Sequence, residues 1–206
     1  RHVLAMNDVR VEPLTVDANG LCPPETVDDA PRLIFVTPSH QYPLGAVMSL
    51  ERRQRLLALA RQQGSWIVED DYDSEFRFSG QPIPALQGLV PDAPVVYIGT
   101  FSKTLYPGLR LGYVVIPRPL VSDLKHAHAE LYRGGHSLIQ MALAEFITAG
   151  HYSAHIRRMR LLYSRRRAFL TELIQRHCMP YALSDFSDNA GLHLILNLPA
   201  EADDVA

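Results

Sequence analysis

The chain has 206 residues, of which 47% are hydrophobic and 20% charged, and its formal net charge is −2. This length and composition indicate a globular protein with one substantial core, or one core and part of a second. The charge gives no global reason to expect nucleic acid or membrane as a partner, and no apolar run reaches the roughly 20 residues that span a bilayer.

Four short apolar runs predict buried strands at residues 33–37, 66–68, 95–98 and 111–116. Helical patterns separate several of them, which favours an α/β fold with a mostly parallel sheet and helices on both faces. Ligands of such sheets collect at the carboxyl ends of the strands. Polar motifs follow the second and third runs, so we expect the functional site there.

The helices can be placed from their ends and apolar stripes. Ser49 predicts the N-cap of a helix that runs to Gln63 and stops at Gly64. Further helices are predicted over residues 119–132, 137–149 (capped by Ser137, stopped by Gly150) and 153–177 (ended by Pro180). The apolar stripes expected on the first and last of these helices consist of Leu50, Leu56, Leu57 and Ala60, and of Ile156, Met159, Tyr163, Leu170 and Ile174.

We expect two structural parts. Residues 1–150 would form part of a large domain, and residues 151–206 a long connecting helix and the start of a small α+β domain, with a strand at 191–196. The chain opens without methionine and stops soon after an apolar run, so we expect a piece of a longer protein. Cys22 and Cys178 match no metal or disulfide spacing, which indicates a reducing, cytoplasmic compartment.

Lys103 lies in "GTFSKTLYPGLRLGY", residues 99–113, and is one of only two lysines in the chain. A lysine amine is a nucleophile only when deprotonated, so catalytic lysines lie where desolvation or nearby cations favour the neutral form. Thr100, Ser102 and Arg110, with the loop N–H groups, could form a phosphate cup. The alternatives are a surface lysine and a loop that binds nothing.

Asp70 and Tyr72 follow the strand predicted at residues 66–68. A carboxylate there could keep a pyridinium nitrogen protonated, as it does for pyridoxal phosphate, and Tyr72 could bond the ring oxygen. The alternatives for Glu69, Asp70 and Asp71 are a solvated turn or a divalent-metal site; the second is weaker because no further acidic cluster or histidine completes a shell. For His193, on the strand predicted at residues 191–196, a structural role is preferred.

Three motifs, in family order and spacing, resemble the fold-type I, aspartate-aminotransferase-like enzymes of pyridoxal phosphate. They are "TPSHQYPLGAVMSLERRQRLLALA" (37–60), "IVEDDYDSEFRF" (67–78) and "YIGTFSKTLYPGLRLGY" (97–113). Within these enzymes, the chain is most similar to the C-terminal domain of MocR-type transcription regulators of the GntR superfamily.

The resemblance implies roles for individual residues. Lys103 would form the internal aldimine, Asp70 would pair with the pyridine nitrogen and Tyr72 with the ring hydroxyl oxygen. Contacts to the phosphate would come from Thr100, Ser102 and Arg110. His40 and Gln41 lie in the loop where aminotransferases keep an asparagine against the ring oxygen, in the form His-Gln-Tyr-Pro-Leu-Gly instead of Asn-Pro-x-Gly.

The resemblance leaves two functions open. The first is a fragment of the effector-sensing domain of a bacterial MocR-type regulator, with an amine or amino acid as effector and DNA bound only through an N-terminal domain outside this chain. The second is a free-standing class I/II aminotransferase, in which Lys103 also moves protons. The family implies a homodimer in both cases. A third possibility is that the fragment alone binds the cofactor poorly.

Overall fold

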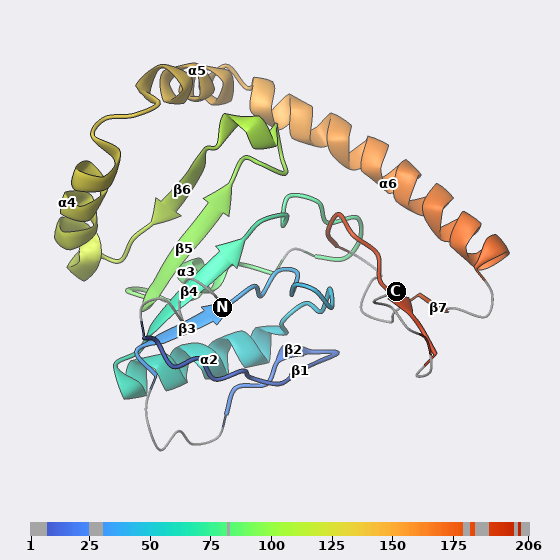
Figure 1. Cartoon of the computed structure of the whole chain (residues 1–206), viewed down its shortest axis with the longest axis horizontal. Helices are drawn as coiled ribbons and strands as arrows, with labels where there is room; N and C mark the ends of the chain where they lie inside the picture. The colour runs from blue at the N-terminus through green and yellow to red at the C-terminus, as the bar shows by residue number, and fades with distance from the viewer. Residues whose placement is uncertain are drawn as a thin grey trace.

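The computed structural model describes residues 8–24, 31–81, 83–178, 182–183, 190–199 and 202. A four-stranded sheet lies at the centre, with one helix against it and three further helices in an arc on the opposite side of the molecule (Figure 1). Two small antiparallel strand pairs lie outside this sheet: β1 (Val16–Asp17) with β2 (Gly20–Leu21), and β7 (Ala182–Leu183) with β8 (Leu196–Asn197).

The central sheet has the strand order β3-β4-β5-β6. Its strands are Leu33–Val36, Trp66–Asp71, Val95–Thr100 and Gly112–Val115. The first three run parallel, and β6 runs antiparallel to β5. All four predicted strands are therefore confirmed, and the sheet is mixed with a parallel majority. Because β3, β4 and β5 run in one direction, their carboxyl ends meet at the same edge.

Helix α2 (Leu50–Gln63) begins and ends as predicted. The Ser49 hydroxyl accepts a hydrogen bond from a backbone N–H of the first turn, and Gly64 adopts a left-handed φ of 66° that closes the helix. The predicted apolar stripe is wrong at Leu50, which is 45% exposed. Arg53, one turn later, takes the inward position because its guanidinium bonds three backbone carbonyls of neighbouring loops.

The hydrophobic core lies between α2 and one face of the sheet. It contains Ile34, Val36, Ile67 and Val95 from the strands and Leu56, Leu57 and Ala60 from the helix, with Leu86 of the short α3 (Leu86–Leu89) packed alongside. The other face is open at β3, where Leu33 and Phe35 are 59% and 61% exposed. In this chain, α2 and α3 thus cover one face of the sheet only.

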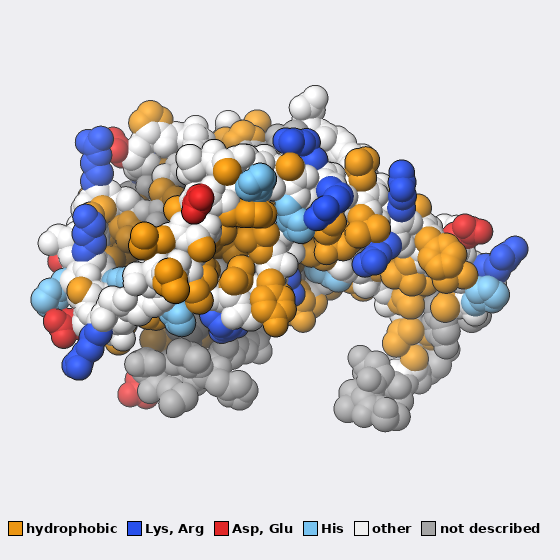
Figure 2. Space-filling model, turned by 90° about the horizontal axis from the view of Figure 1, so that it is seen from above, with side chains coloured by type: hydrophobic (Ala, Val, Ile, Leu, Met, Phe, Trp, Pro, Cys, Tyr) orange, Lys and Arg blue, Asp and Glu red, His pale blue; other side chains and the backbone are white. Residues whose placement is uncertain are grey.

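The arc consists of α4 (Val121–Tyr132), α5 (Ser137–Thr148) and α6 (His151–His177) (Figure 1). These confirm the predicted helices, but neither α4 nor α5 buries a residue. Figure 2, which views the molecule from the α5 side, shows hydrophobic side chains at the surface of this face. Leu131 of α4 and Leu138 of α5 are 79% and 78% exposed.

Two predictions about these helices are wrong. The N-cap of α5 is His136, in a left-handed conformation and without a side-chain cap bond, rather than Ser137. On α6, Ile156 and Ile174 are buried, but Leu170 is 46% exposed. Helical periodicity predicts which face could be buried; the partner that would cover Leu170 has to come from elsewhere in the structure.

The strand predicted at residues 191–196 is also wrong, because only Leu196–Asn197 is in a strand. The preceding residues dock instead against the turn after β4. Ala190 forms an isolated bridge with Arg77, and the Gly191 N–H donates to the Phe76 carbonyl at 2.9 Å. These bonds replace the strand pairing that the apolar sequence suggested. Pro180, the predicted end of α6, lies outside the described residues.

Candidate functional site

The strand register puts two predicted site residues on one face of the sheet. Asp70 on β4 is paired with Ile98 on β5, and Thr100 lies two residues further along β5. Side chains alternate along a strand, so Asp70 and Thr100 point to the same side, at the edge where the parallel strands end. Glu69 and Asp71 point to the opposite side, toward α2.

Glu69 and Asp71 are structural, so the solvated-turn alternative is wrong for them. Glu69 is fully buried and accepts bonds from the backbone N–H groups of Leu86 and Gln87 at 2.9 and 3.1 Å. Burial is the main cause that raises the pKa of its carboxyl group. Asp71 accepts from the Tyr97 hydroxyl at 2.7 Å and from Ser74. Both carboxylates fix the carboxyl end of β4.

Asp70, between them, is half-buried and accepts no hydrogen bond from any of the described residues. Burial raises the pKa of its carboxyl group, and the neighbouring Asp71 adds to the shift. A half-buried carboxylate without a donor is costly, and a cationic ring nitrogen would relieve that cost. The environment of Asp70 therefore fits a pyridinium partner.

Tyr72 is held by the loop that carries His40. Its hydroxyl donates to the His40 carbonyl at 2.9 Å and lies 3.2 Å from His40 Nδ1. Burial, followed by the charges of Asp73 and Asp70, raises the pKa of the Tyr72 hydroxyl well above its usual value. Tyr72 thus stays a proton donor over the physiological range.

His40 and Gln41, the other two predicted site residues, differ in how far their side chains are exposed. His40 is only 2% exposed, and its Nδ1 lies 3.0 Å from Asp73 Oδ2. The Gln41 side chain is partly exposed and closes its own turn: its amide donates to the Tyr42 carbonyl, and its oxygen accepts from the Leu44 N–H at 3.0 Å. Both side chains shape the loop beside Tyr72.

Lys103 lies in the turn that follows β5, and its side chain is exposed. The turn is fixed on both sides of the lysine. Thr100 Oγ1 accepts from the Ser102 N–H at 3.2 Å, and the buried Thr104 is linked through its carbonyl to His155 Nε2 of α6 at 3.0 Å. The backbone at Lys103 is thereby positioned while its amine stays accessible.

Arg110 ends the same loop, just before β6. It adopts a left-handed φ of 52°, and its N–H donates to the Pro107 carbonyl at 3.2 Å. Its side chain is exposed and makes no ion pair with a described residue. Residues 99–113 thus bring together an accessible amine, two hydroxyl groups and a guanidinium that forms no ion pair with a described residue.

Comparison with known proteins agrees with this geometry. Residues 10–206 match the family model "Aminotransferase class I and II". The chain belongs to this family. A kynurenine aminotransferase from Pyrococcus horikoshii, solved in complex with PMP and KYN, has 28% sequence identity and a TM-score of 0.76, and the match covers 84% of this chain and 42% of that one. A multiple substrate aminotransferase from Thermococcus profundus has 26% identity and the same TM-score, over 98% and 45% of the two chains. The expected fold type I is confirmed.

Curated relatives of this aminotransferase-family chain include transcription regulators. It is 42% identical to the HTH-type transcriptional regulator YhdI of Bacillus subtilis, over 96% of this chain and 42% of the relative. It is 43% identical to the probable rhizopine catabolism regulatory protein MocR of Rhizobium meliloti, over 95% and 39%. The predicted resemblance to MocR-type regulators is confirmed, and the chain spans about two fifths of these relatives. Among the described residues, no helix is long and apolar enough to cross a membrane.

Sequence reasoning missed a cluster beside the site of this aminotransferase-family chain. The His193 ring lies 4.3 Å from the His40 ring, and its Nε2 lies 3.1 Å from the Pro43 carbonyl oxygen. His40, Asp73 and His193 are the described residues whose possible metal-ligand atoms come within 4.8 Å of one another. His193 is 150 residues from Pro43 in the chain, so no local spacing could reveal the contact.

Proposed function

We propose that this chain is the pyridoxal-phosphate-binding, effector-sensing part of a cytoplasmic MocR-type transcription regulator. The observation that carries the proposal is the half-buried Asp70 carboxylate, which has no hydrogen-bond donor among the described residues and shares a sheet face and edge with Thr100, at the start of the Lys103 loop. The similarity to regulators at 42–43% identity supports the same function.

Three residues would hold the cofactor ring. Lys103 Nζ would bind its aldehyde carbon, and the Asp70 carboxylate would keep the pyridine nitrogen protonated. The Tyr72 hydroxyl would donate to the ring oxygen in place of the His40 carbonyl. The half-buried position of Asp70 and the raised pKa of Tyr72 support these roles. When bound, pyridoxal phosphate supplies an electron sink for amine chemistry. His40 and Gln41 would contribute by shaping the loop that carries the Tyr72 acceptor.

The phosphate would bind at the other end of the site. Thr100, the last residue of β5, and Ser102, in the turn after it, provide hydroxyl groups, and Arg110 provides a guanidinium without an ion-pair partner among the described residues. Guanidinium binds phosphate through two parallel N–H bonds, while hydroxyl groups bond the remaining oxygens. The three residues lie within residues 99–113, which supports this assignment.

The organisation of the complete protein is part of the proposal. Residues 1–150 would belong to the large cofactor-binding domain, and residues 151–206 to the connecting helix and the small domain. The sheet lies wholly before α6, which supports this division. An N-terminal domain outside this chain would bind DNA, an amine or amino acid would be the effector, and the protein would act as a homodimer, as expected for the family.

A free-standing aminotransferase is the second candidate, because the solved relatives are aminotransferases. The complete protein that contains this chain distinguishes the two in a mobility-shift assay with its own promoter DNA, run beside an assay of keto-acid formation from amino acids. The regulator predicts DNA binding that changes with pyridoxal phosphate and loses this response in Lys103→Ala. Sustained keto-acid formation without any affinity for DNA would support the enzyme instead.

A further inference from the structure

Helix α6 contacts the Lys103 loop with its first two turns and then runs toward β7 (Figure 1). The carbonyl oxygen of Thr104, one residue after Lys103, lies 3.0 Å from His155 Nε2. The ring of Phe101, two residues before Lys103, lies 5.9 Å from the Tyr152 ring in an edge-to-face arrangement. Tyr152 and His155 are three residues apart and therefore lie on one face of the helix. This face holds the loop on both sides of the lysine.

The same face of α6, about two to three turns further along, holds the turn after β4. Arg160 Nε donates a hydrogen bond to the Glu75 carbonyl oxygen. The Tyr163 ring lies 5.2 Å from the ring of Phe76, which is fully buried. This turn follows the strand end that carries Asp70. One helix thus contacts both chain segments of the proposed cofactor site.

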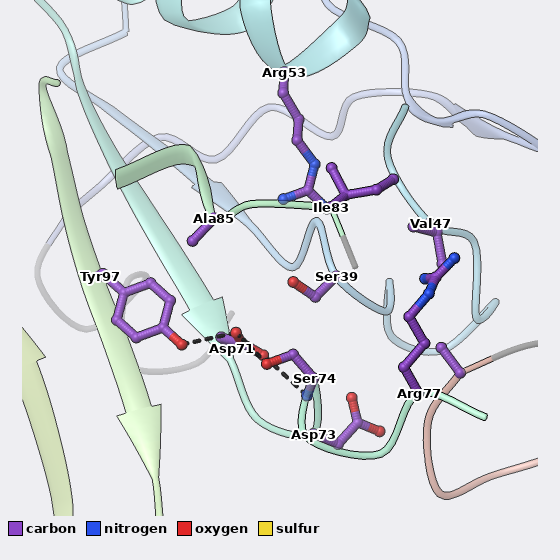
Figure 3. A pocket seen from close by; sticks show the side chains of 11 residues that line it. Ser39, Val47, Arg53, Asp71, Asp73, Ser74, Arg77, Ile83, Ala85 and Tyr97 are labelled. Atoms are coloured by element: carbon purple, nitrogen blue, oxygen red, sulfur yellow. Dashed lines mark hydrogen bonds between the residues drawn. The ribbon is translucent and has the colours of Figure 1, made fainter. Parts of the chain in front are cut away.

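The turn after β4 gives α6 a fixed base. Asp71 accepts hydrogen bonds from the Tyr97 hydroxyl at 2.7 Å and from the Ser74 hydroxyl at 2.6 Å, which are the dashed lines in Figure 3. The first bond ties the turn to β5, and the second closes the turn itself. Helix α6 therefore connects the Lys103 loop to a part of the protein whose position is set by the sheet.

His155 provides a specific polar bond in this connection. Thr104 is only 1% exposed, and in the described part of the chain its carbonyl oxygen has no other donor. A carbonyl can only accept, so His155 Nε2 carries the hydrogen, while Nδ1 faces Arg158 Nη2 at 3.4 Å. Because an unpaired buried carbonyl is costly, loss of the imidazole would release the loop beside Lys103.

We propose that His155 is a positioning residue for Lys103, which holds the loop backbone where Lys103 Nζ reaches the aldehyde carbon of pyridoxal phosphate. This inference rests on the proposed function. The neutral amine adds to that carbon, and the aldehyde oxygen leaves as water with the two amine hydrogens. Lys103 is exposed and its four-carbon stem is flexible, so the reach of its amine depends on where its backbone is held. Asp70 and Tyr72 come from β4 and the turn after it, and do not depend on this bond.

Two forms of the cofactor separate the positioning of Lys103 from binding in general. Pyridoxal phosphate carries the aldehyde that reacts with the lysine, whereas pyridoxamine phosphate carries an amine there and binds without the covalent bond. The complete protein is titrated with each form, by absorbance for the first and by calorimetry for the second. We expect His155→Leu to bind pyridoxal phosphate about tenfold more weakly, and pyridoxamine phosphate within about twofold of the parent protein.

Three further variants sharpen the test. His155→Gln keeps an N–H donor of similar reach to Nε2 and should recover most of the affinity for pyridoxal phosphate. His155→Asn is too short to reach the carbonyl and should behave like His155→Leu. His177→Leu, at an exposed position in the last turn of α6, is the matched control and should leave both affinities unchanged.

Three outcomes would overturn the inference: parent affinity for pyridoxal phosphate in His155→Leu, an equal loss for both cofactor forms, or equal affinities of His155→Gln and His155→Asn. An equal loss would mean that His155 only supports the fold. The Gln and Asn variants keep the test valid if His155→Leu does not fold. A parent protein that forms no bond with pyridoxal phosphate would overturn the proposed function as well, so the two failures are distinct.

Discussion

At the scale of single residues, the neighbours Glu69, Asp70 and Asp71 show how one acidic run serves two purposes. Side chains alternate along β4, so Glu69 and Asp71 point toward the protein interior and Asp70 points to the other face of the sheet. The outer two carboxylates are bonded by N–H and hydroxyl donors, whereas Asp70 accepts no bond from a described residue. The first two thus stabilise the fold, and Asp70 is left for a ligand.

Asp70→Asn should therefore weaken cofactor binding while it stabilises the cofactor-free protein. Burial raises the pKa of Asp70, so the folded protein binds a proton that the unfolded chain releases, and the ionised carboxylate destabilises the fold at pH 7. We expect a higher free energy of unfolding for the variant at pH 7. The difference should vanish below about pH 3.8, where both states are protonated. Urea unfolding at several pH values and absorbance titration with pyridoxal phosphate measure the two effects.

Glu69→Gln is the matched control for this prediction. Its carboxylate bonds two backbone N–H groups and lies 3.9 Å from the buried Arg53 guanidinium, so its loss leaves that cation without its counter-charge. We expect a loss of about 1–3 kcal/mol in the free energy of unfolding. If Asp70→Asn destabilised the protein as much as Glu69→Gln does, the proposed division of roles would be wrong.

At the scale of elements, the short segment around Gly191 docks the C-terminal part onto the site. A Cβ added to Gly191, at a φ of 79°, would lie 1.8 Å from Cε1 of the buried His40 ring. Gly191→Ala should therefore release this segment from the loop of His40 and the turn after β4. We expect faster amide hydrogen exchange over residues 190–193 and a loss of stability greater than the roughly 1–2 kcal/mol of a left-handed alanine.

Gly64→Ala separates the contact from the backbone cost. Gly64 has a similar φ of 66°, but no atom of the described residues lies within 4 Å of an added Cβ. This variant should show only the backbone cost, with unchanged hydrogen exchange at residues 190–193. Equal losses of stability in both variants would mean that His40 moves aside and that its contact with Gly191 does not stabilise the docking of the C-terminal segment.

How far the sequence predicted the fold depended on the range of the interactions. The α2 helix was predicted to the residue because Ser49 and Gly64 act on adjacent backbone, and the strands were predicted because their apolar runs are local. The buried Arg53 and the Asp73–Leu192 bond, 119 residues apart, depend on packing between distant segments. Such contacts leave no spacing signal in one sequence.

For the candidate site too, the sequence predicted the local features but not the contacts between distant segments. Its strand-end residues follow from the pattern of polar groups after buried strands, and the strand register supports Asp70 and Thr100 as neighbours on one face. The sequence did not reveal that His40 is buried against Asp73, or that His193 packs on it. The His40–Asp73 contact joins residues 33 positions apart, and its partner His193 comes from beyond α6.

At the scale of the whole molecule, the chain leaves much apolar surface uncovered. One face of β3 is open, Val114 of β6 is 50% exposed, and α4 and α5 bury no residue. The described part of the chain therefore does not enclose the proposed cofactor site. We expect the missing contacts to come from segments outside the chain and from a second copy.

The 206-residue chain alone should therefore bind pyridoxal phosphate much more weakly than the complete protein. The chain spans about two fifths of its regulator relatives, so contacts to the cofactor from the rest of the protein would be absent, and the open sheet face admits water. Absorbance titrations of both proteins compare the affinities. Near-equal affinities would show that residues 1–206 hold a sufficient site and that this prediction is wrong.

The most direct test of the account is to locate the lysine that binds the cofactor. The complete protein is incubated with pyridoxal phosphate and reduced with borohydride, which links the cofactor covalently to its lysine. The protein is then digested, and the masses of its peptides are measured by mass spectrometry. Lys125, on the exposed surface of α4, is the matched control within this chain. We predict the added pyridoxyl-phosphate mass on the peptide of Lys103, its loss in Lys103→Ala and its retention in Lys125→Ala. Labelling that persists in Lys103→Ala at the parent level, or that never reaches Lys103, would contradict the account.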